Sequence, residues 1–171
     1  CGPGEVTARI TARAAAPEKA EAMMQPVYEE ILRRVGEACY GEGVNRTPAD
    51  AVLELLKNRG ETVTFAESCS GGLLCGAFVD CAGASDCLKE SFVTYANEAK
   101  EDLLGVKSET LARCGAVSGE CAREMALGAA RAAGADWAVS VTGIAGPGGG
   151  TAEKPVGTVW IGVAHRGTAQ A

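Results

Sequence analysis

The 171-residue sequence predicts a layered α/β fold, an α/β/α sandwich in which helices cover both faces of a mostly parallel sheet. Segments with the apolar pattern of strands alternate along the chain with segments that have the pattern of helices. One strand segment, residues 136–141, is almost entirely apolar, as is typical of a central strand covered on both faces. Aromatic residues make up only 5% of the sequence while alanine and glycine are frequent, which favours close packing of helices on a sheet.

Charge and hydropathy argue against several classes of protein. The net charge is −6 and the basic residues are scattered, which argues against a nucleic-acid-binding groove. No apolar run is long enough to cross a membrane, and the sequence shows no signal peptide. We therefore expect a cytoplasmic protein with neither nucleic acid nor a membrane as a partner. Because the sequence begins at Cys1 rather than at methionine, we also expect a fragment of a longer protein.

The eight cysteines are predicted to be reduced and to pack as small apolar side chains. Most of them lie in apolar helical segments where alanine would also fit. None forms a Cys-x-x-Cys pair, which argues against a zinc site and against a redox motif. They are Cys1, Cys39, Cys69, Cys75, Cys81, Cys87, Cys114 and Cys121.

The N-terminal residues are predicted to form an incomplete unit of their own. Apolar and polar residues alternate over residues 5–14, which predicts a strand with one buried face. From residue 17 to about residue 39 the pattern is helical, and Pro26 should kink this helix or start a second one. One strand and one helix cannot bury their apolar faces alone, so we interpret them as half of a small α+β unit, followed by a linker at residues 40–46.

The main domain is predicted to begin with a helix that has Thr47 as its N-cap, Pro48 as its first residue and a stop at Gly60. The residues expected on its inner face are Val52, Leu55 and Leu56. The further elements expected are a strand at 62–65, a helix at 73–79, a strand at 90–95, a helix capped by Asn97 and ending at Gly105, a short helix from Ser108, a long helix capped by Ser118, and strands at 136–141 and 156–164.

A turn rich in small residues joins the first of these strands to its helix. It contains two hydroxyl groups, Ser68 and Ser70, and two glycines, Gly71 and Gly72. Glycine allows the backbone to approach a ligand closely, and the first free N–H groups of the helix favour an anion or a developing oxyanion. The turn can therefore bind phosphate, present a nucleophile or do both, although such turns also occur for packing alone.

Lys100 has an unusual position in the second loop of this kind. If Asn97 caps the following helix, Lys100 lies in the first turn, where the helix dipole disfavours a cation by roughly 0.3 to 1 kcal/mol. The same field, together with partial burial, would favour the neutral amine that a lysine general base needs. The alternative is an exposed lysine that pairs with Glu98 or Glu101.

A third loop, residues 142–151, follows the apolar strand and begins with Thr142 and Gly143. It contains Gly146 but lacks the Gly-Lys-Ser/Thr ending of nucleotide triphosphatase phosphate loops. Its backbone N–H groups could hold a ribose or a phosphate, and the alternative is a flexible connection. In open α/β sheets, ligands bind at the carboxyl ends of strands, and the loops that begin at Ser68, Tyr95 and Thr142 all leave such ends.

The chemically simplest catalytic pair is Ser68 activated by Lys100, with Tyr95 able to relay a proton or to hold a carbonyl. The sole histidine, His165, lies near the end of the chain, which argues against a Ser-His-Asp triad or a Cys-His dyad. Cys69 could be a nucleophile in principle, but buried packing is the more common role of such a cysteine. Ser70 is only two residues from Ser68, so the identity of the nucleophile stays open.

In order and spacing, a series of motifs from about Thr47 to Ala164 resembles the CinA C-terminal family. The preceding strand and helix resemble the small KH-like segment that joins this domain to a larger N-terminal domain in CinA proteins. The motifs are Ala66-Glu67-Ser68-Cys69-Ser70-Gly71-Gly72, Phe92-Val93-Thr94-Tyr95-Ala96-Asn97-Glu98-Ala99-Lys100, Gly115-Ala116-Val117-Ser118, Val141-Thr142-Gly143-Ile144-Ala145-Gly146-Pro147-Gly148-Gly149-Gly150 and Glu153-Lys154-Pro155-Val156-Gly157.

The resemblance implies an amidohydrolase that converts nicotinamide mononucleotide (NMN) and water into nicotinic acid mononucleotide and ammonia, in pyridine nucleotide recycling. Ser68 would be the nucleophile, Lys100 its base and Tyr95 a supporting hydroxyl. The residues that would shape the nucleotide site are Ser70, Gly71, Gly72, Thr142, Gly143 and Gly146. No cofactor and no metal are implied, and the implied assembly is a homo-oligomer, commonly a dimer.

The sequence also departs from the family pattern. Ser70 stands where family members usually have threonine, which keeps the hydroxyl. The family continues past the last strand into another strand and helix with a phosphate-binding arginine, so we expect residues 43–171 to be a CinA C-terminal domain truncated at its end, after a partial KH-like segment at 1–42. The alternative to an enzyme is a non-catalytic nucleotide-binding or regulatory module, attached to an N-terminal domain linked to ADP-ribose hydrolysis.

Overall fold

The computed structural model describes residues 4–43 and 46–171, which form two compact units, Cys1–Arg46 and Thr47–Ala171. The expectations for Cys1 and for the linker residues Val44 and Asn45 lie outside the described residues.

The first unit is dominated by one helix, α1 (Pro17–Val35), which ends in a short 3-10 turn, η1 (Gly36–Ala38). The helix runs without interruption through Pro26, so Pro26 does not start a second helix. The strand predicted at residues 5–14 is wrong, because this stretch is extended but pairs with no other strand among the described residues, and Val6 is 87% exposed. An alternating pattern forms a strand only when a partner supplies the hydrogen bonds.

The second unit begins with α2 (Pro48–Arg59), whose ends confirm the prediction. Thr47 is the N-cap and forms a capping box with Asp50, and Gly60 ends the helix in a left-handed conformation. The predicted inner face is only partly right: Leu53 and Leu56 are buried, whereas Val52 and Leu55 are 45% and 56% exposed. The buried face of α2 is therefore shifted by about one residue from the predicted face. Such a shift is possible because α2 packs against the sheet on one side only.

A five-stranded mixed sheet forms the centre of this unit, in the order β2-β1-β3-β4-β5. Its strands are β1 (Val63–Glu67), β2 (Phe92–Val93), β3 (Trp137–Gly143), β4 (Val159–His165) and β5 (Thr168–Gln170). β1 pairs in parallel with β2 and β3, whereas β4 is antiparallel to both β3 and β5. The α/β class is confirmed and β3 is central, and the parallel half of the sheet is the half that carries the predicted site.

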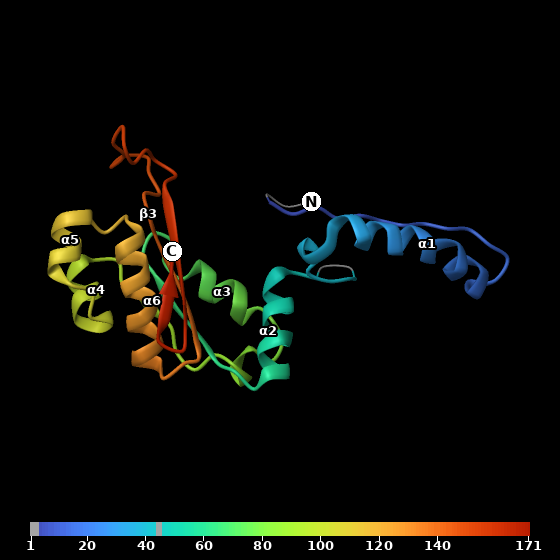
Figure 1. Cartoon of the computed structure of the whole chain (residues 1–171), viewed down its shortest axis with the longest axis horizontal. Coiled ribbons are helices and arrows are strands. Elements are labelled where there is room, and N and C mark those ends of the chain that lie inside the picture. Colours follow the sequence, from blue (N-terminus) through green and yellow to red (C-terminus); the bar gives the residue numbers. More distant parts are fainter. Residues whose placement is uncertain (1–3, 44–45) are drawn as a thin grey trace. The chain divides into compact units, whose positions relative to one another are not determined.

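Helices lie on both faces of the sheet (Figure 1). They are α3 (Leu73–Val79), the 3-10 turn η2 (Ala84–Asp86), α4 (Asn97–Leu104), α5 (Ser108–Cys114) and α6 (Gly119–Ala133). α2 and α3 cover one face, where Phe65 of β1 is buried, and α4, α5 and α6 cover the other, where Ala66 is buried. Ala96, not Asn97, is the N-cap of α4, but Lys100 still lies in its first turn.

α4 and α6 pack in backbone contact, and this contact determines where Lys100 lies. A Cβ atom added at Gly128 of α6 would lie 1.9 Å from the carbonyl oxygen of Leu104 at the end of α4. Only glycine allows so close an approach. The short helix that carries Lys100 is therefore held directly against the longest helix of this unit.

Candidate functional site

Ser68 and Lys100 meet at the carboxyl end of β1. Ser68 directly follows the strand, its N–H donates to Val141 O at 2.9 Å, and the residue is only 8% exposed. The Lys100 side chain reaches the same point from α4 and is 1% exposed, with Nζ 3.1 Å from Ser68 Oγ. The alternative, an exposed Lys100 paired with Glu98 or Glu101, is therefore wrong.

Two carbonyl oxygens complete the surroundings of the Lys100 amine. Nζ lies 2.8 Å from Thr94 O and 3.2 Å from Tyr95 O, both in the loop between β2 and α4. A neutral amine has two N–H donors and one lone pair, so it can donate to both carbonyls and accept the Ser68 hydroxyl proton. These partners are those that a general base needs.

Burial lowers the pKa of Lys100 below its ordinary value of 10.5, because it removes the ammonium from water. The side chains of Cys121 and Cys69 oppose this shift, but the net direction is downward. No carboxylate forms an ion pair with Lys100 in the described part of the chain. The buried Lys100 amine therefore loses its proton more readily than a lysine in water.

The Tyr95 side chain is not brought to this pair. It is 77% exposed, and the contact of Tyr95 with Lys100 is made by its backbone carbonyl. The hydroxyl role expected for Tyr95 therefore has no support in this arrangement of side chains.

Glu67 was given no role by the sequence, yet its carboxylate occupies the start of α3. It is fully buried and accepts hydrogen bonds from the N–H groups of Gly72, Leu74 and Cys75 at 3.0, 3.0 and 2.8 Å. The expectation that these helical N–H groups are free for an anion is thus wrong, because a side chain of the same chain satisfies them.

The pKa of Glu67 is lowered even though burial by itself would raise it. The backbone N–H groups of Cys75, Leu74 and Gly72 and the nearby Ser70 hydroxyl lower this pKa, and together these four groups outweigh the effect of burial. The Ser70 hydroxyl oxygen is buried and makes no hydrogen bond of ordinary geometry. The hydrogen bonds to its carboxylate thus favour the ionised form of Glu67 beneath the turn.

Two backbone donors in the turn stay available beside Ser68. The hydrogen bonds of the described residues include none donated by the N–H of Cys69 or of Ser70, whereas the Gly71 N–H donates to Ser68 O at 3.2 Å. A donor pair that directly follows a nucleophile is suited to hold the oxyanion of a tetrahedral intermediate. Gly71 and Gly72 shape this turn with φ angles of +60° and +106°.

Of the three residues predicted in the third loop, Gly143 lies against the turn, whereas Thr142 and Gly146 have other neighbours. A Cβ at Gly143 would lie 3.1 Å from Cys69 Sγ and 2.7 Å from Thr158 O, so this glycine lets β3 end against the turn. Thr142 is buried and its hydroxyl donates to Ala116 O at 2.8 Å. Gly146 packs against Val156 farther along the loop.

Lys154 fastens the loop between β3 and β4, which stands clear of the helices in Figure 1. Its Nζ donates to Cys114 O at the end of α5 and to Val117 O in the connection to α6, both at 2.7 Å. The sequence predicts no role for Lys154; the signal that could have indicated one is that a lysine follows the glycine-rich loop.

His165 lies at the opposite end of the sheet from Ser68. It stacks on Trp137, the first residue of β3, at 3.8 Å between ring centroids, and its Nε2 is 3.8 Å from Glu61 Oε1. The histidine therefore takes no part in the Ser68 site.

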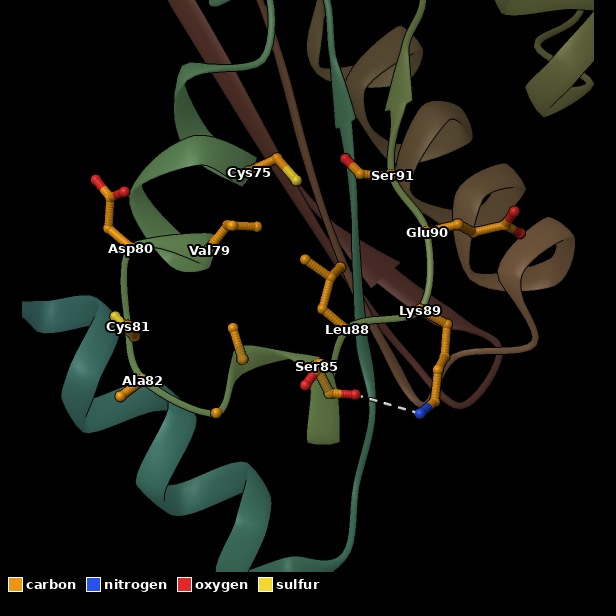
Figure 2. A pocket seen from close by; sticks show the side chains of 12 residues that line it. Cys75, Val79, Asp80, Cys81, Ala82, Ser85, Leu88, Lys89, Glu90 and Ser91 are labelled. Carbon is orange, nitrogen blue, oxygen red and sulfur yellow. Dashed lines mark hydrogen bonds between the residues drawn. The ribbon is translucent and has the colours of Figure 1, made fainter.

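A separate hollow of about 580 Å³ lies beside the edge strand β2 and is shown in Figure 2. Cys75, Val79 and Leu88 point into it, whereas Asp80 points away. Two of the polar side chains around it are already hydrogen-bonded: Ser91 Oγ donates to Phe65 O, and Lys89 Nζ donates to Ser85 O. None of its lining residues is a predicted site residue.

Within residues 4–43 and 46–171, no three His, Cys, Asp or Glu side chains are grouped so that they could hold a metal ion. None of the helices in this part of the chain combines the length and the apolar character that crossing a membrane requires.

Comparisons with known proteins give one consistent result. Residues 45–171 match the family described as CinA C-terminal domain, and residues 1–41 match the damage-inducible protein CinA KH domain. A CinA-like protein of Kosmotoga olearia is 50% identical over 160 residues, 94% of this chain and 39% of that protein. A putative competence-damage inducible protein of Clostridium perfringens is 50% identical over 159 residues, 93% of this chain and 38% of its own. The chain thus spans about two fifths of the length of these relatives.

Solved structures agree with this result. The competence/damage inducible protein CihA from Agrobacterium tumefaciens is 44% identical with a TM-score of 0.69, and the match covers 75% of this chain and 81% of that one. A competence-damaged protein (CinA) superfamily protein from Escherichia coli is 32% identical with a TM-score of 0.70, covering 79% and 81%.

Proposed function

Because the chain belongs to the CinA family, we propose that it is an amidohydrolase that converts NMN and water into nicotinic acid mononucleotide and ammonia. The substrate class comes from the family resemblance of the motifs. The chemistry is supported by one observation above all: a buried lysine with a lowered pKa lies 3.1 Å from a serine hydroxyl.

The proposed reaction begins when Ser68 Oγ attacks the carboxamide carbon while Lys100 Nζ takes the hydroxyl proton. The N–H groups of Cys69 and Ser70 hold the oxyanion. The C–N bond then breaks, and Lys100 returns the proton so that the NH₂ group leaves as ammonia. Water attacks the acyl-enzyme ester, Lys100 takes one of its protons and passes it to Ser68, and the carboxylic acid is released.

The non-catalytic alternative accounts less well for Lys100. A nucleotide-binding module gains nothing from an amine that is 1% exposed and has no counter-ion among the described residues. A general base requires this cost, since burial lowers the pKa of Lys100 and so makes the neutral amine easier to reach.

The test is ammonia release from NMN by the purified protein and its Ser68→Ala and Lys100→Met variants. We expect turnover by the wild type and a fall of about 10²- to 10⁴-fold in each variant. Matched controls are Ser108→Ala and Lys107→Met, which alter exposed side chains, and both should retain activity. NMN binding without turnover in the wild type would instead favour the non-catalytic module.

The proposal also includes a homodimer in the cytoplasm. The seven described cysteines are free, in keeping with a reducing compartment. Val159 and Ile161 of β4 are 49% and 56% exposed, an apolar surface that a second copy could cover. Light scattering of the purified protein measures the mass directly.

A further inference from the structure

The carboxylate of Glu67 is the most unusual charge outside the Ser68–Lys100 pair. It is fully buried, and in the described part of the chain no lysine, arginine or histidine lies within ion-pair distance of it. A buried charge without a cation is stable only when hydrogen bonds replace its water, and here three backbone N–H groups do so.

These three bonds tie both ends of the Ser68 turn together. Glu67 is the last residue of β1, whereas Gly72, Leu74 and Cys75 belong to the cap and first turn of α3. The residues between them, Ser68 to Gly71, form a loop closed by this single side chain. The loop contains the nucleophile and the two unused N–H donors.

We propose that Glu67 is a positioning residue for the attack by Ser68. It holds the Cys69 and Ser70 N–H groups where the oxyanion forms, and it blocks the start of α3 so that no substrate anion binds there. The inference rests on the proposed role of Ser68 as nucleophile. If Glu67 occupies these N–H groups, the phosphate of the substrate has to bind elsewhere than at the start of α3.

Glu67→Gln tests the proposal, because the amide keeps the size of the side chain but has only one oxygen to accept from three donors. We expect kcat for NMN to fall by about a hundredfold, with KM within about twofold of the wild type. The rate of Ser68 sulfonylation by phenylmethanesulfonyl fluoride, followed by mass spectrometry, should fall in parallel. This labelling does not depend on the amide substrate.

The matched control is Glu98→Gln, which removes an exposed carboxylate from the first turn of α4. It should leave kcat and labelling unchanged. If Glu67→Gln does not fold by circular dichroism, Glu67→Asp decides, because it keeps the charge but is too short to reach all three N–H groups. The proposal would be overturned if a folded Glu67 variant had the same labelling rate and the same kcat as the wild type.

The outcomes separate this inference from the proposed function. A wild type that is sulfonylated at Ser68 but does not hydrolyse NMN contradicts the proposed substrate, while the labelling rates still decide the role of Glu67. A wild type that is neither labelled nor active removes the nucleophile and the inference together.

Discussion

The basicity of Lys100 is determined by the buried, uncharged surroundings of its amine and not by an ion pair. The amine is buried among a hydroxyl and two carbonyls, none of which carries a charge. An ammonium in such a place loses hydration without gaining a counter-ion, so its proton is bound less tightly than in water. Lysine, which is normally a cation, is thereby suited to act as a base.

This environment predicts how the rate depends on pH. Only the neutral Lys100 can accept the Ser68 proton, so kcat/KM should rise with pH through the pKa of Lys100 and then level off. Because burial lowers this pKa, the midpoint should lie below 10.5. Rates measured from about pH 6 to about pH 11 check this, in the range where lysine titrates.

Lys100→Arg provides the control for the pH profile, since a guanidinium stays protonated over the whole range. The variant should lose the rising limb along with most of its activity. A wild-type midpoint at or above the ordinary lysine value would contradict the role of burial.

Sequence reasoning found Lys100 but not Glu67, for a physical reason. A lysine in the first turn of a helix opposes the dipole, and this conflict is visible in the sequence once the helix is placed. Glu67 creates no such conflict, because an acidic residue at the end of a strand looks like any polar residue. Its role depends on the path of the turn, which brings the backbone of residues 72–75 back over the strand end.

At the scale of elements, the contact between α4 and α6 controls the site. α4 has eight residues, too few to be stable without packing, and it meets α6 where Gly128 faces Leu104 O. Lys100 lies one turn before Leu104 on the same helix. Any displacement of α4 is therefore passed on to the distance between Nζ and Ser68 Oγ.

Gly128→Ala should displace α4, because the new methyl group would begin 1.9 Å from Leu104 O. We expect a loss of stability of about 1 to 3 kcal/mol, typical of overpacking, and a clear fall in kcat. Thermal unfolding and ammonia release measure the two effects.

Gly76→Ala is the control, since a Cβ at Gly76 in α3 meets nothing within 4 Å. That variant should be as stable as the wild type or slightly more stable, because alanine is the better helix former. Unchanged activity in Gly128→Ala would show that Lys100 does not depend on this contact.

Several helix ends that depend on contacts within a few residues were predicted correctly. Strands that depend on pairing with a distant strand were predicted less well. The caps Thr47 and Ser118 and the stop at Gly60 were confirmed, since each is a contact within a few residues. β5 was missed because its three residues are recognisable only through pairing with β4. The strand predicted at residues 5–14 was wrong because the pattern is present but no partner strand pairs with it among the described residues.

At the scale of the whole molecule, every predicted site residue lies in the second unit. Ser68, Lys100 and the third loop all belong to Thr47–Ala171, as do both helical layers around the sheet. Because this unit has its own apolar core on each face of the sheet, we expect it to fold independently.

A protein that consists of residues 47–171 should therefore retain the kcat and KM of the whole chain within about twofold, since distant and independent parts act additively. Circular dichroism checks folding, and ammonia release from NMN checks activity. A folded fragment without activity would show that the first unit contributes to the site.

The three oxygens around Lys100 Nζ have a consequence for the catalytic cycle. The charged amine can donate to all three, and the neutral amine can donate to two and accept from the third, so the same heavy atoms suit both states. The proton can pass between Ser68 Oγ and Lys100 Nζ while the backbone stays where it is. This transfer needs little reorganisation, because the folded chain already orients the two carbonyl dipoles around the amine.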